Sequence, residues 1–185
     1  TKATDPLSRS SYSYYDDLGR VTKSEDPLGK NATSAYDLEG RQTLATDANS
    51  KSFYTYYDAG GLVTKTVDAA SREVVFSYDD AGRKTALTDA NSHTTAFAYD
   101  KLARLTKLIY PNSDAEEYYF DTAGQMTAKT TPNNATMAYA YSPLGLMTLK
   151  TYPGPSTVTY SFDAGGRRTQ VVDANTENTY CYDDA

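Results

Sequence analysis

The chain repeats itself with a period of 21 residues. Asp follows the marker aromatic in every unit but one, where Ser142 replaces it. A fixed period of this length means that each unit is one supersecondary element packed against its neighbours, so it constrains the architecture more than composition does. The last marker comes one residue early, and the series is Tyr15, Tyr36, Tyr57, Tyr78, Tyr99, Phe120, Tyr141, Phe162 and Tyr182.

Two further columns keep the same period. Gly stands four positions after the aromatic in seven units, and Ala103 is the exception. Thr stands seven positions after it without exception, at Thr22, Thr43, Thr64, Thr85, Thr106, Thr127, Thr148 and Thr169. Thr1 falls in the Thr column, and the chain stops at Ala185 where Gly-Arg is due. We therefore expect residues 1–185 to be one array of about nine units that continues past both ends.

Each unit contains two turn signals, which together predict a β-hairpin. In Asp-x-x-Gly, as at residues 16–19, Asp accepts a hydrogen bond from the backbone two residues on, and Gly adopts a positive φ. A second signal lies midway, as at residues 26–29 (Asp-Pro-Leu-Gly). The segments between turns, such as 83–88 and 94–99, have the length and the Thr, Val and Tyr content of strands. The fold class is therefore all-β, with tandem hairpins forming a curved antiparallel sheet.

The aromatic residues indicate how the faces of this sheet differ along the chain. From residue 76 onward they pair at i and i+2, which puts both rings on one face and predicts ladders of rings and Thr hydroxyls. In earlier units Tyr12 and Tyr14, and Tyr54 and Tyr56, place rings on the other face as well. Proline at 111, 153 and 155 predicts a longer or redirected midway turn in two later units.

The consensus Tyr-Asp-x-x-Gly-Arg resembles the YD repeat, or Rhs repeat, of Rhs and toxin-complex shell proteins, wall-associated bacterial proteins and teneurins. The resemblance covers essentially the whole chain. Its intact copies, with the Thr that follows, are Tyr15, Asp16, Gly19, Arg20, Thr22, Tyr36, Asp37, Gly40, Arg41, Thr43, Tyr78, Asp79, Gly82, Arg83 and Thr85. The resemblance implies a segment of a spiralling β-shell that encloses a C-terminal toxin or effector domain.

Composition excludes several classes of protein. The net charge is −6, evenly spread, which argues against a nucleic-acid partner because phosphates demand a basic face. One cysteine, Cys181, excludes an internal disulfide framework. No apolar run approaches the ~20 residues of a membrane span. The 18 tyrosines against five phenylalanines indicate an interior, if there is one, made of tyrosine and short aliphatic residues.

No residue pattern indicates catalysis, a metal or a cofactor. The stretch 14–27 superficially resembles the end-of-shell motif near which some Rhs proteins cleave themselves, but Asp17 and Val21 depart from it and more repeats follow. The Asp column recurs once per unit without a calcium loop, so turn capping explains it better. His93 is the only histidine and lacks clustered partners. We predict that the chain is not an enzyme.

Two functional hypotheses remain. In the first, the chain is a structural wall segment of a secreted or cell-surface bacterial shell, with flanking YD repeats and a C-terminal cargo domain as its partners. In the second, it is a carbohydrate-binding or adhesion module that uses Tyr12, Tyr14, Tyr54 and Tyr56 as ligand-facing rings. Exposed sheet edges also predict self-association.

Overall fold

The computed structural model describes residues 1–183, and these form strands, turns and no helix. The chain divides into two compact units, the first spanning Thr1–Thr94 and the second beginning at Thr95. The strands of unit 1 are β1 (Lys2–Thr4), β2 (Ser10–Tyr15), β3 (Val21–Glu25), β4 (Asn31–Tyr36), β5 (Gln42–Thr46), β6 (Ser52–Tyr57), β7 (Val63–Val67), β8 (Glu73–Tyr78) and β9 (Lys84–Thr88).

Unit 2 repeats this arrangement. Its strands are β10 (Thr94–Tyr99), β11 (Leu105–Ile109), β12 (Ala115–Phe120), β13 (Met126–Thr130), β14 (Thr136–Tyr141), β15 (Met147–Thr151), β16 (Thr157–Phe162), β17 (Arg168–Val172) and β18 (Glu177–Thr179). Within each unit, every strand pairs antiparallel with the next strand along the chain. The predicted all-β fold of tandem hairpins is confirmed.

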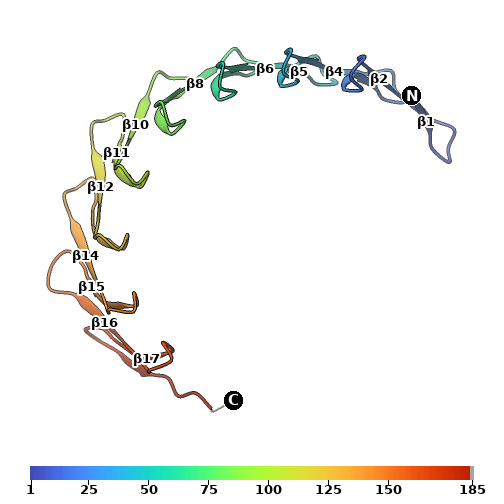
Figure 1. The fold of residues 1–185 in the computed structure, drawn as a ribbon. Coiled ribbons are helices and arrows are strands. Elements are labelled where there is room, and N and C mark those ends of the chain that lie inside the picture. Colours follow the sequence, from blue (N-terminus) through green and yellow to red (C-terminus); the bar gives the residue numbers. More distant parts are fainter. Residues whose placement is uncertain (184–185) are drawn as a thin grey trace. The chain divides into compact units, whose positions relative to one another are not determined.

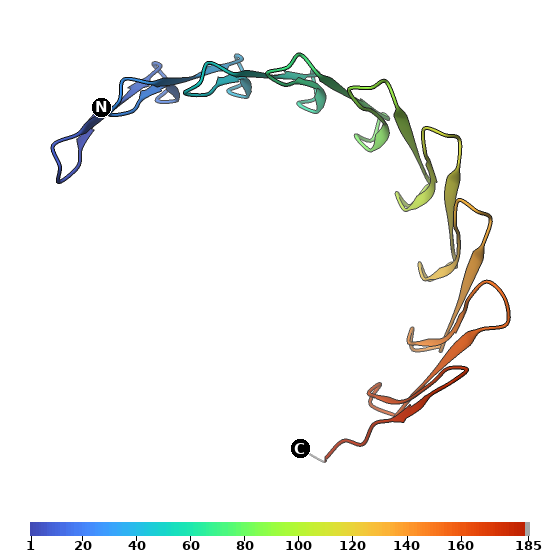
Figure 2. The same cartoon turned by 180° about the vertical axis from the view of Figure 1, so that it is seen from behind.

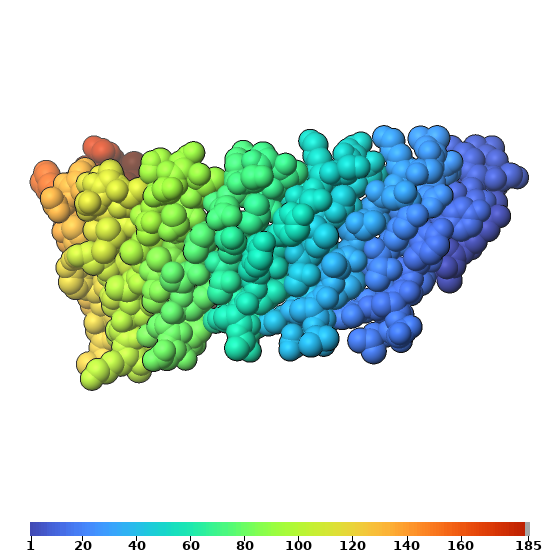
Figure 3. Space-filling view, turned by 90° about the horizontal axis from the view of Figure 1, so that it is seen from above, coloured from blue at the N-terminus to red at the C-terminus, as the bar shows by residue number. Residues whose placement is uncertain are grey.

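Each unit is a single layer of strands. No helix or second sheet covers either unit in the two opposite views (Figures 1 and 2), and the sheet of unit 2 bends along its strand order (Figure 1). The space-filling view shows one face of unit 1 uncovered from strand to strand (Figure 3). A strand in such a sheet can shield its side chains only with those of its neighbours.

The described residues contain no buried core. None of them reaches the buried class, and the accessible surface is 12336 Å². A compact protein of 20.3 kDa would expose about 8,800 Å². The strands are instead half-buried throughout their middle positions, as in β7, β9, β11, β13 and β15. The interior that composition indicated is therefore spread over two faces as cross-strand contacts.

The turns follow the predicted chemistry. The amide of Gly19 donates to the carbonyl of Asp16 at 2.9 Å, and the amide of Asp16 donates to the carbonyl of Arg20 at 3.0 Å. Gly19 has φ +78°, a left-handed conformation that only glycine adopts without strain. Ala103 holds the same turn position at φ +62° in its unit and carries that strain.

The prediction of longer turns at the prolines is wrong. The amide of Ser113 donates to the carbonyl of Tyr110 at 2.9 Å, the same closure that Gly29 and Asp26 make in an earlier unit. Tyr152 and Ser156 keep the five-residue closure as well, at 2.9 Å. Proline fits because its fixed φ suits the first central position of a type I turn, whose amide that turn does not use.

We predict opposite effects for one substitution made in both directions. Gly19→Ala should lower the free energy of unfolding by about 1 kcal/mol, because a left-handed alanine is strained while its Cβ would meet no atom within 4 Å. Ala103→Gly should raise it by up to the same amount. Urea denaturation followed by circular dichroism measures both. Shifts of the same sign would contradict this account of the turns.

Candidate functional site: the turn spine and the exposed tyrosines

The Asp of each Tyr-Asp turn binds both the turn and an arginine. In the first copy, Oδ1 of Asp16 accepts from the amides of Leu18 at 3.0 Å and Arg20 at 2.9 Å, and Oδ2 accepts from Nε of Arg20 at 2.6 Å. The same pairs recur as Asp37 with Arg41, Asp79 with Arg83, Asp100 with Arg104 and Asp163 with Arg167. One carboxylate thus fixes the turn and orients a cation.

That arginine then reaches the next hairpin. Nη1 of Arg41 donates to the carbonyl of Asp58 at 3.1 Å, and its guanidinium carbon lies 4.7 Å from the centre of the Tyr57 ring. Arg104 makes the same two contacts in unit 2, to the carbonyl of Asp121 at 3.2 Å and to the Phe120 ring at 4.6 Å. The prediction that this column pairs with aspartates or covers rings is confirmed, because it does both. We call this chain of Asp, Arg and the next turn the turn spine.

The spine explains a second demand for glycine. A Cβ at Gly40 would lie 3.5 Å from Nη1 of Arg20, so the arginine lies directly over the following turn. Where other residues interrupt the arginine column, their side chains take the same path. A methyl of Leu62 would lie 3.6 Å from a Cβ at Gly82, and the amide of Gln125 would lie 3.0 Å from one at Gly145.

The marker tyrosine binds backward to the preceding hairpin. The hydroxyl of Tyr57 donates to the carbonyl of Gln42 at 3.0 Å, and that of Tyr78 donates to the carbonyl of Val63 at 2.8 Å. Tyr36 and Tyr141 do the same with Val21 and Met126. A phenylalanine fills the position but cannot make this bond. Arginine and tyrosine therefore tie neighbouring hairpins together in both directions.

The invariant threonine has a role that the sequence did not reveal. In β4 and β5, Ala35 pairs with Leu44 while Tyr36 pairs with Gln42, so Thr43 is the extra residue of a β-bulge. Its hydroxyl donates to the carbonyl of Ala35 at 3.3 Å. Thr22, Thr64, Thr106 and Thr148 make the equivalent bond. We expected these hydroxyls to form ladders, but they satisfy the bulge within their own hairpin.

The turn aspartates are held ionised. Hydrogen bonds from the Arg72 guanidinium, then from the Arg72 amide, lower the pKa of Asp68 to about 2. The Arg83 guanidinium and amide lower the pKa of Asp79, and the Arg20 amide followed by its guanidinium lowers that of Asp16. A carboxyl whose folded pKa is depressed stabilises the fold above its unfolded pKa and loses that effect as the pH falls.

The four predicted ligand-facing tyrosines lie on one face of unit 1. Tyr54 and Tyr56 alternate with Phe53 and Thr55 along β6, so they share a face, and Tyr12 and Tyr14 take the same positions in β2. Their exposed fractions are 36% to 46%. Lysine amines lie 4.9 Å from the Tyr14 ring and 4.6 Å from the Tyr56 ring, within cation–π distance.

A shallow hollow of about 510 Å³ adjoins two of these rings, and its lining includes Ala35, Leu44, Tyr54 and Tyr56. Sequence reasoning missed Tyr119, which is 48% exposed and stands three periods after Tyr56. Its place in the repeat frame was the signal. A hollow at the same repeat positions, including Ala98, Glu117 and Tyr119, lies in unit 2.

The other candidate groups remain apart. Among residues 1–183, no three His, Cys, Asp or Glu side chains gather where they could hold a metal ion. Nδ1 of His93 lies 3.4 Å from the Asp89 carboxylate on the surface, and Cys181 is exposed. In that same described part of the chain, no helix has the length and apolar character to cross a membrane.

Comparison with known proteins identifies the family. A family model described as Teneurin YD-shell matches residues 9–185. The chain belongs to this family. The comparison with curated proteins gave no match.

Solved structures show the same YD-shell fold at low identity. The Tc holotoxin pore of Photorhabdus luminescens matches at 17% identity with a TM-score of 0.62, over 92% of this chain and 11% of that one. The TcdB2–TccC3 complex matches at 17% identity with a TM-score of 0.63, over 92% and 12%. The chain thus spans about a ninth of the length of these toxin-complex chains.

We predict that the array loses stability as pH falls from 4 toward 2. The thermal midpoint should decline over this range, because Asp68 and its equivalents must take up protons that the unfolded chain binds at higher pH. Asp68→Asn should lower the midpoint at pH 5 and flatten the decline. Asp80→Asn, beside a turn aspartate but not the residue that closes the turn, is the control and should keep the original slope. A midpoint independent of pH would contradict this origin of stability.

Proposed function

We propose that the chain is a non-catalytic wall segment of a YD shell that encloses or presents a toxin or effector domain in a longer protein. The observation that carries this is the single layer: residues 1–183 bury no side chain fully, yet every hairpin is tied to its neighbour by the turn spine. Such a sheet suits a thin wall better than a compact binding domain. The toxin-complex fold of its structural relatives supports the proposal.

The proposed setting follows from the same reasoning. A wall of this kind belongs to a bacterial protein that is secreted or held at the cell surface. Flanking YD repeats would pair with the edge strands β1 and β18, and the C-terminal cargo domain would face the sheet. Unpaired edge strands favour pairing with another chain, so the isolated segment would also self-associate.

The wall function predicts protection of the cargo from protease. In the parent protein, identified as a band several times the 20.3 kDa of this chain with an antibody against residues 1–185, a protease site inserted after the array should be cut slowly. Removing three hairpins of the array should expose the site and speed cutting. The same site placed in an exposed N-terminal tail is the control. Equal cutting rates at both positions in the intact protein would contradict enclosure.

A carbohydrate-binding or adhesive function is the second candidate. The exposed rings of Tyr54 and Tyr56 beside the hollow at Ala35 and Leu44 favour it, because a half-exposed ring offers an apolar face and a hydroxyl to a sugar.

The binding function predicts a loss of affinity when these rings are removed. The unaltered chain should retain glycans on an array, and Y54A/Y56A should weaken retention by about tenfold or more. Tyr15→Ala is the matched control, since Tyr15 is 48% exposed but alternates with Tyr14 along β2 and so lies on the opposite face. Absence of any glycan binding by the unaltered chain would remove this candidate.

A further inference from the structure

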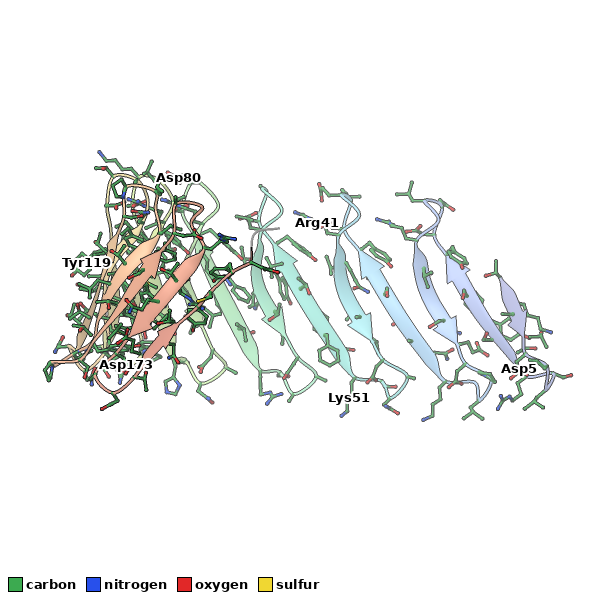
Figure 4. All side chains as sticks on the ribbon, turned by 90° about the horizontal axis from the view of Figure 1, so that it is seen from below. Asp5, Arg41, Lys51, Asp80, Tyr119 and Asp173 are labelled. Carbon is green, nitrogen blue, oxygen red and sulfur yellow. The ribbon has the colours of Figure 1, made fainter. Side chains whose placement is uncertain are left out.

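The two edges of the unit 1 sheet carry leucines at the tips of their turns. One edge, the Tyr-Asp edge, consists of turns 16–19, 37–40, 58–61 and 79–82, and the other, the mid-repeat edge, consists of turns 5–8, 26–29, 47–50 and 68–71. Figure 4 labels Arg41 and Asp80 on the first edge, and Asp5 and Lys51 on the second. The leucines and their exposed fractions are Leu18 at 75% and Leu38 at 98% on the Tyr-Asp edge, and Leu7 at 73% and Leu28 at 83% on the mid-repeat edge.

Turn chemistry does not call for these leucines. The central positions of such turns favour Pro, Asp, Asn, Ser or Gly, and the later turns of unit 1 carry alanine, aspartate or asparagine there. A leucine at a turn tip gains nothing from its own hairpin, since its side chain remains in solvent. Both edges therefore present an apolar pair at the same end of the unit, over the first two turns of each row.

The charges of the two edges are complementary. Each turn of the Tyr-Asp edge, counted through the residue after it, has one more acidic than basic side chain, and the surplus includes Asp17, Glu39 and Asp80. Each of the four mid-repeat turns is neutral and ends in a cation, Arg9, Lys30, Lys51 or Arg72.

These mid-repeat cations lie outermost. The side chains of Arg9 and Arg72 are 62% and 70% exposed, whereas their partners Asp5 and Asp68 are 32% and 26% exposed. On the Tyr-Asp edge the order is reversed, because Arg41 is 26% exposed and Glu39 is 66% exposed. One edge thus presents positive groups to a neighbour, and the other presents negative groups.

The spacing of the two rows also matches. Successive turns on one edge are two strands apart, about 10 Å, and both edges belong to the same strands. A mid-repeat edge laid along a Tyr-Asp edge therefore meets a leucine with a leucine and a cation with a carboxylate at each step. No other partner of regular structure is specified by the chain in this way.

We propose that copies of this chain associate side by side, with the mid-repeat edge of one unit 1 against the Tyr-Asp edge of unit 1 in a second copy. The contact is made by turn tips, so it differs from strand pairing at β1 or β18. It joins two different surfaces and is therefore heterologous, which allows further copies to add. It also goes beyond the wall function, because it joins two sheets and does not require a cargo.

A mixing experiment with two variants tests the proposal. L7N/L28N removes the apolar pair of the mid-repeat edge, and L18N/L38N removes that of the Tyr-Asp edge. Asn suits turn positions, and circular dichroism with thermal denaturation verifies folding. In sedimentation velocity, each variant alone should self-associate about tenfold or more weakly than the unaltered chain, whereas their mixture should form a one-to-one complex through the two intact edges.

The matched control and a charge exchange complete the test. L102N/L144N alters the equivalent tips of unit 2, whose mid-repeat turns carry no leucine, and should leave association unchanged. Lys30→Glu and Glu39→Lys should each weaken association, and K30E/E39K should restore it. The proposal is overturned if the unaltered chain stays monomeric, if L7N/L28N associates as the unaltered chain does, or if the two leucine variants fail to pair. Any of these results leaves the cargo-protection experiment untouched, so the wall function is judged separately.

Discussion

The Asp carboxylate of the Tyr-Asp turn is the interaction on which the rest of this structure depends. One oxygen of Asp37 holds the amide of Arg41 at 2.8 Å, and the other holds Nε of the same residue at 2.6 Å. Turn closure and arginine orientation are therefore set together. Because the arginine then lies over the next glycine and the next ring, the carboxylate determines how one hairpin is placed on another. A substitution there would disturb the junction between hairpins as well as the turn.

Hairpins held in this way do not need a buried core. Each strand is covered by its two neighbours, and the remaining stability comes from many small contacts, such as hydroxyl-to-carbonyl bonds, ring contacts and partly exposed ion pairs. This explains how a sheet with so much tyrosine and so little leucine in its strands can be ordered. It also explains why both faces stay available, one of them with the rings of Tyr14 and Tyr56 half-exposed.

Much of this fold was predictable because its determinants are local and repeat. Asp16 and Gly19 announce a turn by their own chemistry, and alternation along the strands assigns Tyr54 and Tyr56 to one face. The role of Thr43 was not predictable, since a bulge depends on how two strands pair and not on either strand alone. Pro111 misled because a missing amide matters only where the ladder would use it. Tyr119 was visible in the repeat frame, whereas the division near residue 94 leaves no mark in the sequence.

The reach of the hairpin-to-hairpin bonds has a consequence for how such arrays change in evolution. The tyrosine hydroxyl binds a carbonyl 15 residues before it, and the arginine binds one 17 residues after it. Both separations are shorter than the 21-residue period. Duplicating or deleting one whole unit therefore returns every tyrosine and arginine to an equivalent partner, while a gain or loss of any other length breaks the frame. Genes for these arrays can lengthen or shorten in steps of 63 nucleotides without redesign of a single junction.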